Sequence, residues 1–292
     1  MPDVAANPHS VPPIGLRRRI TDHVMTGIAV LTVLVVLAPL IAIFGYLVYR
    51  GVGSINWDFL TQTPKPVGEI GGGMANAIVG SALNLALASI IGVPFGVGAG
   101  VFLAEYGRNR LGDIIRFTAD VLNGVPSIVI GIVAYAIVVL YQKHFSALAG
   151  GVALAIMMIP TISRTTEEML LLVPTALREA AYGLGIPRWR TTLSITLRTA
   201  TSGVITGIML AFARVAGETA PLLFTAFGNQ YWNLHTDQPT AALPLQIYTY
   251  ALSPYDDWHR QAWAGSLVLI ILIVSSVAAV RFAVRRGTFG AA

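Results

Sequence analysis

The sequence contains no cysteine and few charged residues. Without thiols the chain can form no disulfide and no thiolate-bound metal site. Only 11% of its 292 residues are Asp, Glu, Lys or Arg, whereas a soluble domain usually has about 25%. So few charges cannot cover the surface of a water-soluble protein, but they suffice if most of that surface faces lipid. The composition therefore predicts a protein embedded in a membrane.

Two further absences argue against an enzyme. The sequence has no G-x-x-x-x-G-K-[ST] phosphate loop, so it lacks this means of binding and hydrolysing ATP. Its five histidines have no metal-ligand spacing, and its apolar runs hold no convergent group of His, Ser and carboxylate side chains. We expect the chain to have no enzymatic activity, no metal and no cofactor of its own.

Long apolar runs dominate the rest of the sequence. A helix that crosses a bilayer takes about 20 residues, and none of the runs alternates with the period of two that a barrel strand requires. The first run is too long for a signal peptide and is expected to be retained. The predicted spans are 24–49, 74–104, 120–141, 148–173, 199–227 and 262–284. The expected organisation is a flexible tail over 1–23, a first helix over 24–49, and a five-helix core over 74–284.

The arginines fix the expected orientation. With six spans, one side of the membrane receives only Arg50, Lys65, Lys143 and Arg260. The other side receives Arg17, Arg18, Arg19, Arg108, Arg110, Arg116, Arg178, Arg188, Arg190, Arg198, Arg281, Arg285 and Arg286. Cytoplasmic loops carry the excess of basic residues, so both termini are predicted to be cytoplasmic. The basic residues behind the net charge of +5 lie between apolar runs and form no stripe, so we expect no nucleic acid as a partner.

Glycines Gly92, Gly96 and Gly100 fall four residues apart in the second span. Small residues on one helical face let two helices approach closely in lipid. We expect them to pack against another helix.

The longest outer segment, residues 228–261, is rich in proline, aspartate and tryptophan. It is either an interfacial connector with aromatic side chains at the membrane surface or a docking surface for a partner outside the membrane.

Residues 177–198, the hairpin, form a distinctive segment between the fourth and fifth spans. Glu179, Ala180 and Ala181 suit a short helix, and Gly185 can adopt the left-handed conformation that ends one. Pro187 then suits the first turn of a second helix. Small alanines permit another surface to approach. The flanking arginines, among them Arg188 and Arg190, could pair with acidic groups on that surface.

This hairpin resembles the EAA loop of the permeases of ATP-binding-cassette importers. The pattern is carried by Glu179-Ala180-Ala181, Gly185, Ile195 and Leu197, with Arg198 where the family has proline. The resemblance implies an all-α, six-helix, type I importer permease core, in which the hairpin is a cytoplasmic coupling helix seated in a separate ATPase. ATP and Mg²⁺ are then expected on that partner.

The fifth span contains two charges, Arg214 and Glu218. A charge at the centre of a bilayer costs about 2.5 kcal/mol or more, and residues four apart on a helix are close enough to pair. The pair is either purely structural or functional, with Glu218 orienting an Arg214 that meets an anion. Gly217 and Pro221 should make the helix easy to bend here.

The fourth span places Arg164 among hydroxyl side chains. Arginine and hydroxyls suit a tetrahedral oxyanion, because the planar guanidinium can bind two oxygens at once. Glu168, four residues on, is expected to pair with Arg164, although Glu167 and Glu168 could instead only solvate the helix end. The hydroxyls belong to Thr161, Ser163, Thr165 and Thr166.

A further candidate anion contact is Ser127, which follows Val125 and Pro126. Pro126 either starts a helix whose free amides face the pathway or only kinks the span for packing.

Several segments resemble the PstA family, the permease subunits of phosphate-specific importers. They are residues 103–106, 125–129, 164–169, 217–226 and 243–248. The resemblance implies that Arg164, Arg214 and Glu218 lie on a phosphate pathway. It also implies three partners: a PstC-like permease subunit, a PstB-like ATPase dimer and a PstS-like phosphate-binding protein.

Three other functions compete with this interpretation. An importer of sulfate, molybdate or phosphonate would use the same arginines and hydroxyls. A gradient-driven transporter would predict inverted repeats, which the sequence does not show. An embedded enzyme would need the catalytic group that is missing.

Overall fold

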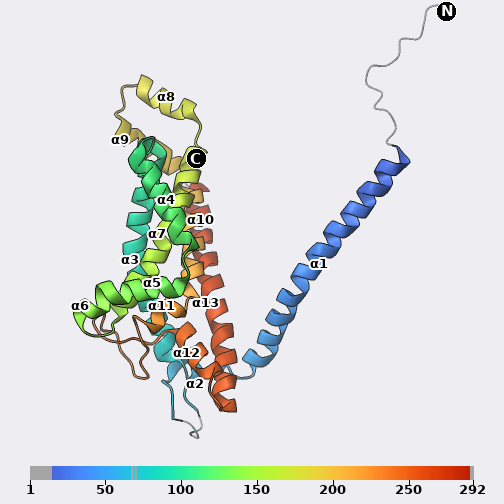
Figure 1. Ribbon diagram of the computed structural model, residues 1–292, viewed down its shortest axis with the longest axis vertical. Helices are drawn as coiled ribbons and strands as arrows, with labels where there is room; N and C mark the ends of the chain where they lie inside the picture. The colour runs from blue at the N-terminus through green and yellow to red at the C-terminus, as the bar shows by residue number, and fades with distance from the viewer. Residues whose placement is uncertain (1–14, 67–68, 70, 290–292) are drawn as a thin grey trace, which may run out of the picture. The chain divides into compact units, whose positions relative to one another are not determined.

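The computed structural model describes residues 15–66, 69 and 71–289, and those residues are largely helical (Figure 1). The chain divides into two compact units, Met1–Tyr49 and Arg50–Ala292. Most of helix α1 (Leu16–Val52) belongs to the first unit. It contains the whole predicted first span, but it also includes residues 16–23, so the predicted boundary of the tail at residue 23 is wrong. The rest of that predicted tail, residues 1–14, lies outside the described residues.

The second unit is built around two helices, α3 (Ala75–Tyr106) and α7 (Ala147–Leu171). A Cβ atom added to Gly96 would lie 2.7 Å from the Cβ of Ile162, and one added to Gly100 would lie 2.5 Å from the Cβ of Thr166. The glycine face of α3 therefore lies directly against α7, as small-residue packing in membranes requires. The predicted role of the glycines is confirmed.

The predicted third span, 120–141, is not one helix. The chain forms α4 (Arg110–Gly124), breaks at Val125 and Pro126, and continues with α5 (Ser127–Ala134). The segment Ser127–Gln142 that α5 begins lies at 109° to α4. Proline has no amide hydrogen to donate, and it pushes the residue before it into extended conformation. Val125 has ψ 134° for this reason.

A π-helical turn (Tyr135–Val139) and α6 (Leu140–Gln142) complete this bent pair. In the described residues, five helices are long and apolar enough to cross a membrane, and the bent pair makes a sixth crossing if it is counted as one span.

The hairpin of residues 177–198 has the predicted form. Helix α8 (Thr175–Gly183) ends in a turn at Gly185, whose φ is +77°, and α9 (Arg188–Thr191) follows directly after Pro187. A π-helical turn (Thr192–Thr196) then leads into α10 (Leu197–Ala216).

The predicted fifth span, 199–227, ends early. Helix α10 stops at Ala216, and residues 217–219 precede the short helix α11 (Ala220–Leu223). A continuous helix would need Pro221 to donate to the carbonyl of Gly217, which proline cannot do.

The outer segment is not only a surface connector. Thr240, Ala242 and Leu243 are almost completely buried, and the amide of Leu243 donates to Ser81 of α3 at 2.6 Å. Helix α12 (Leu243–Ala251) follows and packs on α13 (Asp256–Phe289). Figure 1 shows α12 and α2 (Trp57–Thr61) at the end of this unit opposite α8 and α9.

Candidate functional site

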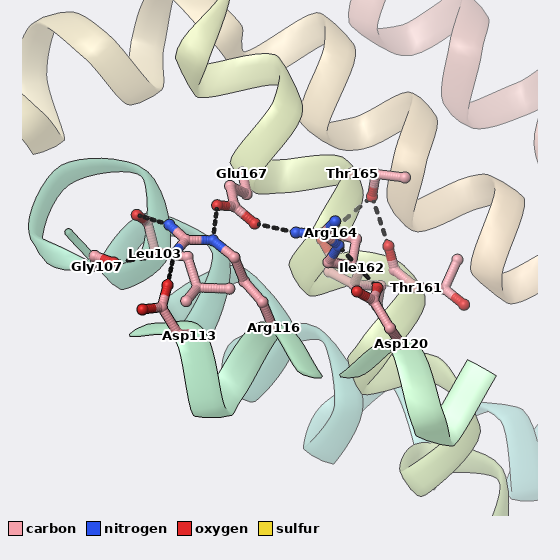
Figure 2. Close-up of polar contacts among 10 residues, drawn as sticks. All are labelled: Leu103, Gly107, Asp113, Arg116, Asp120, Thr161, Ile162, Arg164, Thr165 and Glu167. Atoms are coloured by element: carbon pink, nitrogen blue, oxygen red, sulfur yellow. Dashed lines mark hydrogen bonds and ion pairs between the residues drawn. The ribbon is translucent and has the colours of Figure 1, made fainter. Parts of the chain in front are cut away.

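A network of charged side chains joins α4 to α7 (Figure 2). At its centre is Glu167, which is 3% exposed. One carboxylate oxygen accepts from Nε of Arg116 at 2.7 Å, and the other accepts from Nη1 of Arg164 at 2.8 Å. A buried carboxylate is stable only when it is paired and hydrogen-bonded, and Glu167 has both partners.

Arg164 has a second partner on its open side. Its Nε lies 3.2 Å from the carboxylate of Asp120 on α4. The side chain of Arg164 is 31% exposed and that of Asp120 is 57% exposed, whereas Glu167 is nearly closed off. Arg164 therefore stands between a buried and an accessible carboxylate, and an anion approaching it would compete mainly with Asp120.

The predicted pairing of Arg164 with Glu168 is wrong. Glu168 is exposed and makes no ion pair within the part of the chain that the structure describes. Glu167 replaces it because a residue three positions along also lies on the same helical face, and because Arg116 of α4 holds Glu167 there.

The hydroxyls of the fourth span do not gather around Arg164. Thr161 donates to Asn123 on α4, and Thr165 donates to its own helix at the carbonyls of Thr161 and Ile162. Thr165 also packs against Gly207 of α10, where an added Cβ would lie 2.4 Å from its oxygen. The remaining two, Ser163 and Thr166, are buried. The side chain of Thr166 and the backbone carbonyl of Ser163 lie against Gly100 of α3. The helical period distributes these residues over three neighbouring helices.

Arg116 also binds the end of α3. Its guanidinium donates to the carbonyls of Leu103 and Gly107, and it lies 3.2 Å from Asp113. Carbonyl groups at the C-terminal end of a helix have no partner within the helix and favour a cation. Arg116 therefore joins α3, α4 and, through Glu167, α7.

The predicted ion pair between Arg214 and Glu218 does not form. Arg214 lies in the last turn of α10, and Glu218 lies beyond the end of that helix. The side chain of Arg214 is exposed and that of Glu218 is half-buried, and neither makes a hydrogen bond or ion pair to another described residue. The helix break after Ala216 removes the continuous turn that the spacing of four requires.

Ser127 is the first residue of α5, so Pro126 does begin a helix. This helix also packs closely on α11, because a Cβ added to Gly131 would lie 2.6 Å from the Cα of Pro221. The break at Pro126 thus brings α5 against the segment that follows Arg214 and Glu218.

The hairpin presents some, but not all, of its predicted contact residues. Glu179 and Ala180 are exposed on α8, as is Gly185 in the turn. Ala181 is only 3% exposed and is covered by this chain itself, so the prediction that both alanines admit a partner is wrong for Ala181. Neighbouring residues on a helix point in different directions, and only Ala180 faces outward.

The two hairpin arginines differ. Arg188 lies over the ring of Tyr106 at 4.5 Å and donates to the carbonyl of Glu105, so it is engaged within the chain. Arg190 is exposed and lies 5.7 Å from the ring centre of Trp189 beside it. Of the two, Arg190 is the one available to an acidic partner.

Sequence reasoning missed several charged residues that the structure brings together. Asp120 and Arg116 were attributed only to a span and to a basic cluster, and Glu105 only to a short family motif. A signal was present for Glu105, because a carboxylate directly at the end of a membrane-spanning run favours a cationic partner. The described residues contain no group of three His, Asp or Glu side chains placed to hold a metal ion.

Over most of its length, the chain is similar to known transport permeases. Residues 92–287 match the family described as binding-protein-dependent transport system inner membrane component. The chain is 45% identical over 272 residues to the phosphate transport system permease protein PstA of Yersinia pestis, covering 92% of each protein. It is 44% identical to the protein of the same name in Haemophilus influenzae, with 88% of this chain and 91% of that protein covered.

A solved structure has the same fold. Inward-facing structures of the MetNI methionine ABC transporter include a chain with a TM-score of 0.56 and 18% sequence identity, covering 73% of this chain and 94% of that one. The predicted all-α, type I importer permease fold is thus confirmed. The chain belongs to the binding-protein-dependent inner-membrane transport components and, within them, to the PstA family of permeases.

Proposed function

We propose that this chain is the membrane permease subunit of an ATP-driven phosphate importer. The observation that carries the proposal is the 45% identity over 92% of both chains to a protein named as a phosphate transport permease. The arginines at the helix breaks and in the charged network supply the anion-binding chemistry that this substrate needs.

The proposed pathway contains Arg164, Arg214, Glu218, Thr165 and Ser127. Arg214 is the strongest of these, because its exposed guanidinium has no partner in the described residues and a partner subunit or a passing anion can reach it. Arg164 is partly neutralised by Asp120 and Glu167, which favours weak, reversible contact with an anion. Conduction requires such weak binding along the path.

The proposed partners follow from the importer family. A PstC-like permease completes the pathway, a PstS-like protein delivers phosphate, and a PstB-like ATPase dimer holds ATP and Mg²⁺. The exposed residues of the hairpin, Glu179, Ala180, Gly185 and Arg190, are available to that ATPase. Arginines cluster at the hairpin end of the bundle, and basic loops stay in the cytoplasm, so both termini are proposed to be cytoplasmic.

The proposed mechanism is alternating access. Closure of the ATPases on ATP moves the hairpin and opens the helices outward, and phosphate then passes the arginines toward the cytoplasm.

Complementation tests this function. A bacterial strain that lacks its own phosphate permease subunit should regain uptake of radiolabelled phosphate when it expresses this chain. Uptake of sulfate, but not phosphate, in a matched strain lacking a sulfate permease would favour the other oxyanion importers and contradict the proposal.

A further inference from the structure

The last turn of α3 carries a buried carboxylate that the proposed pathway does not use. The side chain of Glu105 is 5% exposed. Its Oε1 accepts from both Nε and Nη2 of Arg178 on α8, at 3.1 and 2.9 Å. Arg178 is itself only 15% exposed. Charge-assisted bonds of this kind are strong and directional, so α8 is held to α3 by a specific ion pair.

The same guanidinium also holds the end of α7. Arg178 donates to the carbonyls of Leu170 and Val173, at 2.8 and 2.6 Å. Leu170 lies in the last turn of α7 and Val173 lies just beyond its end, where carbonyls lack partners within the helix and favour a cation. One side chain therefore binds the hairpin to both α3 and α7.

The second arm of the hairpin is attached to the same place. Arg188, at the start of α9, donates to the carbonyl of Glu105 and lies over the ring of Tyr106. Cations over aromatic rings are attracted by the ring. Both arms thus end on Glu105 and Tyr106, the last two residues of α3.

The two helices to which the hairpin is attached, α3 and α7, pack directly against each other. The glycine face of α3 brings its backbone against α7 from Gly92 to Gly100, and α7 carries Arg164 and Glu167. Closely packed elements move as units, because interiors have little free volume.

We propose that the ion pair of Glu105 and Arg178 is the junction through which movement of the hairpin reaches α3 and α7. The two side chains are positioning residues, not pathway residues. The proposal rests on the proposed function, in which an ATPase moves the hairpin. It assigns to the pair the task of keeping the hairpin and the two helices in one rigid unit during that movement.

A distance measurement tests the junction independently of the substrate. Because the chain has no cysteine, spin labels can be placed at Leu184→Cys, just after α8, and at Leu171→Cys, the last residue of α7; both residues are exposed. In the complete complex, the unaltered junction should give one narrow distance distribution, the same without nucleotide and with ATP. Glu105→Gln keeps the shape of the side chain but removes its charge, and the distribution should become broad and shift on ATP binding.

Matched variants keep the test falsifiable. Glu105→Asp retains the charge and should restore most of the narrow distribution, and Arg178→Lys, which loses the second contact to the carboxylate, should give an intermediate one. Arg110→Gln removes an exposed arginine at the same end of the bundle and should change nothing. A Glu105→Gln distribution identical to that of the unaltered junction would overturn the proposal.

Transport provides the second readout. Phosphate taken up per ATP hydrolysed should fall about tenfold in Glu105→Gln, while the ATPase still co-purifies. If the ATPase instead dissociates from Glu105→Gln, the pair seats the partner and does not transmit its movement, and the inference is wrong. Absence of phosphate uptake by the unaltered complex would refute the proposed function, whereas the distance measurement would still decide the junction.

Discussion

Glu167 is a buried carboxylate that bridges two arginines from different helices. Glu167→Gln should lower the free energy of unfolding by about 1–3 kcal/mol, because both guanidinium groups lose a charged partner but keep others. The measurement is the thermal stability of the purified protein in detergent.

The neighbouring Glu168 gives the control for that substitution. It is exposed and has no ion pair in the described residues, so Glu168→Gln should change stability by no more than about 0.5 kcal/mol. Equal effects of the two substitutions would contradict the bridging role of Glu167.

Arg214 should matter for transport and not for folding. Its exposed side chain makes no hydrogen bond or ion pair to the described residues that Arg214→Ala would break. We expect this variant to abolish phosphate uptake while the permease still assembles, as measured by uptake and by recovery of the complex. Arg110→Ala, which removes another exposed arginine, should leave uptake normal. Normal uptake in Arg214→Ala would remove Arg214 from the proposed pathway.

At the residue scale, the sequence predicts which charges need partners but not which partners they find. Spacing allowed Arg164 to pair with Glu168, yet the contact to Arg116 on α4 selects Glu167. That contact joins residues 51 positions apart in the chain, and no local pattern encodes it.

Among the helices, the pair α3 and α7 depends on glycine. A Cβ at Gly100 would lie 2.6 Å from the carbonyl oxygen of Ser163, which cannot easily move. Gly100→Ala should therefore destabilise the protein by about 1–3 kcal/mol, as overpacking does, and lower its melting temperature in detergent.

Gly98 lies in the same helix and provides the matched control. An added Cβ there meets nothing within 4 Å, and alanine favours helix over glycine. Gly98→Ala should leave the melting temperature unchanged or raise it. A loss of stability at Gly98 as large as that at Gly100 would show that helix propensity, and not close packing, sets the effect.

The hairpin is tested by charge reversal. Glu179 is exposed on α8, and we expect it to pair with a cationic group of the ATPase. Glu179→Lys should leave the permease folded but reduce the ATPase that co-purifies with it, because the lysine would repel that group. Asp22→Lys reverses an exposed charge on α1 and should have no effect. Undiminished co-purification in Glu179→Lys would contradict the proposed docking role.

At the scale of helices, local sequence predicts most spans and the hairpin, because apolar length and Gly185 act locally. It could not predict the breaks. The tripeptide Gly-Val-Pro occurs at 92–94 inside α3 and again at 124–126, where α4 ends. At 92–94 the tripeptide lies within α3, which packs along α7. At 124–126 it ends α4, and the next helix, α5, packs on α11. Tertiary contacts therefore decide whether the tripeptide breaks the helix.

For the whole molecule, the distribution of charge agrees with one proposed orientation. The hairpin, the start of α4 and the end of α13 lie at one end of the second unit (Figure 1). They contain arginines of the clusters that predict the cytoplasmic side. The opposite end holds α12 and the buried part of the outer segment. These features fit a permease that receives its substrate at one end and its energy at the other.

Transport by the purified complex is the direct test of the proposed function. The permease, with its proposed partner permease and ATPase, is reconstituted in liposomes that contain ATP, and phosphate-binding protein is added outside. We expect ATP-dependent accumulation of radiolabelled phosphate that sulfate does not inhibit. ATP-dependent accumulation of sulfate with a sulfate-binding protein, and none of phosphate, would contradict it.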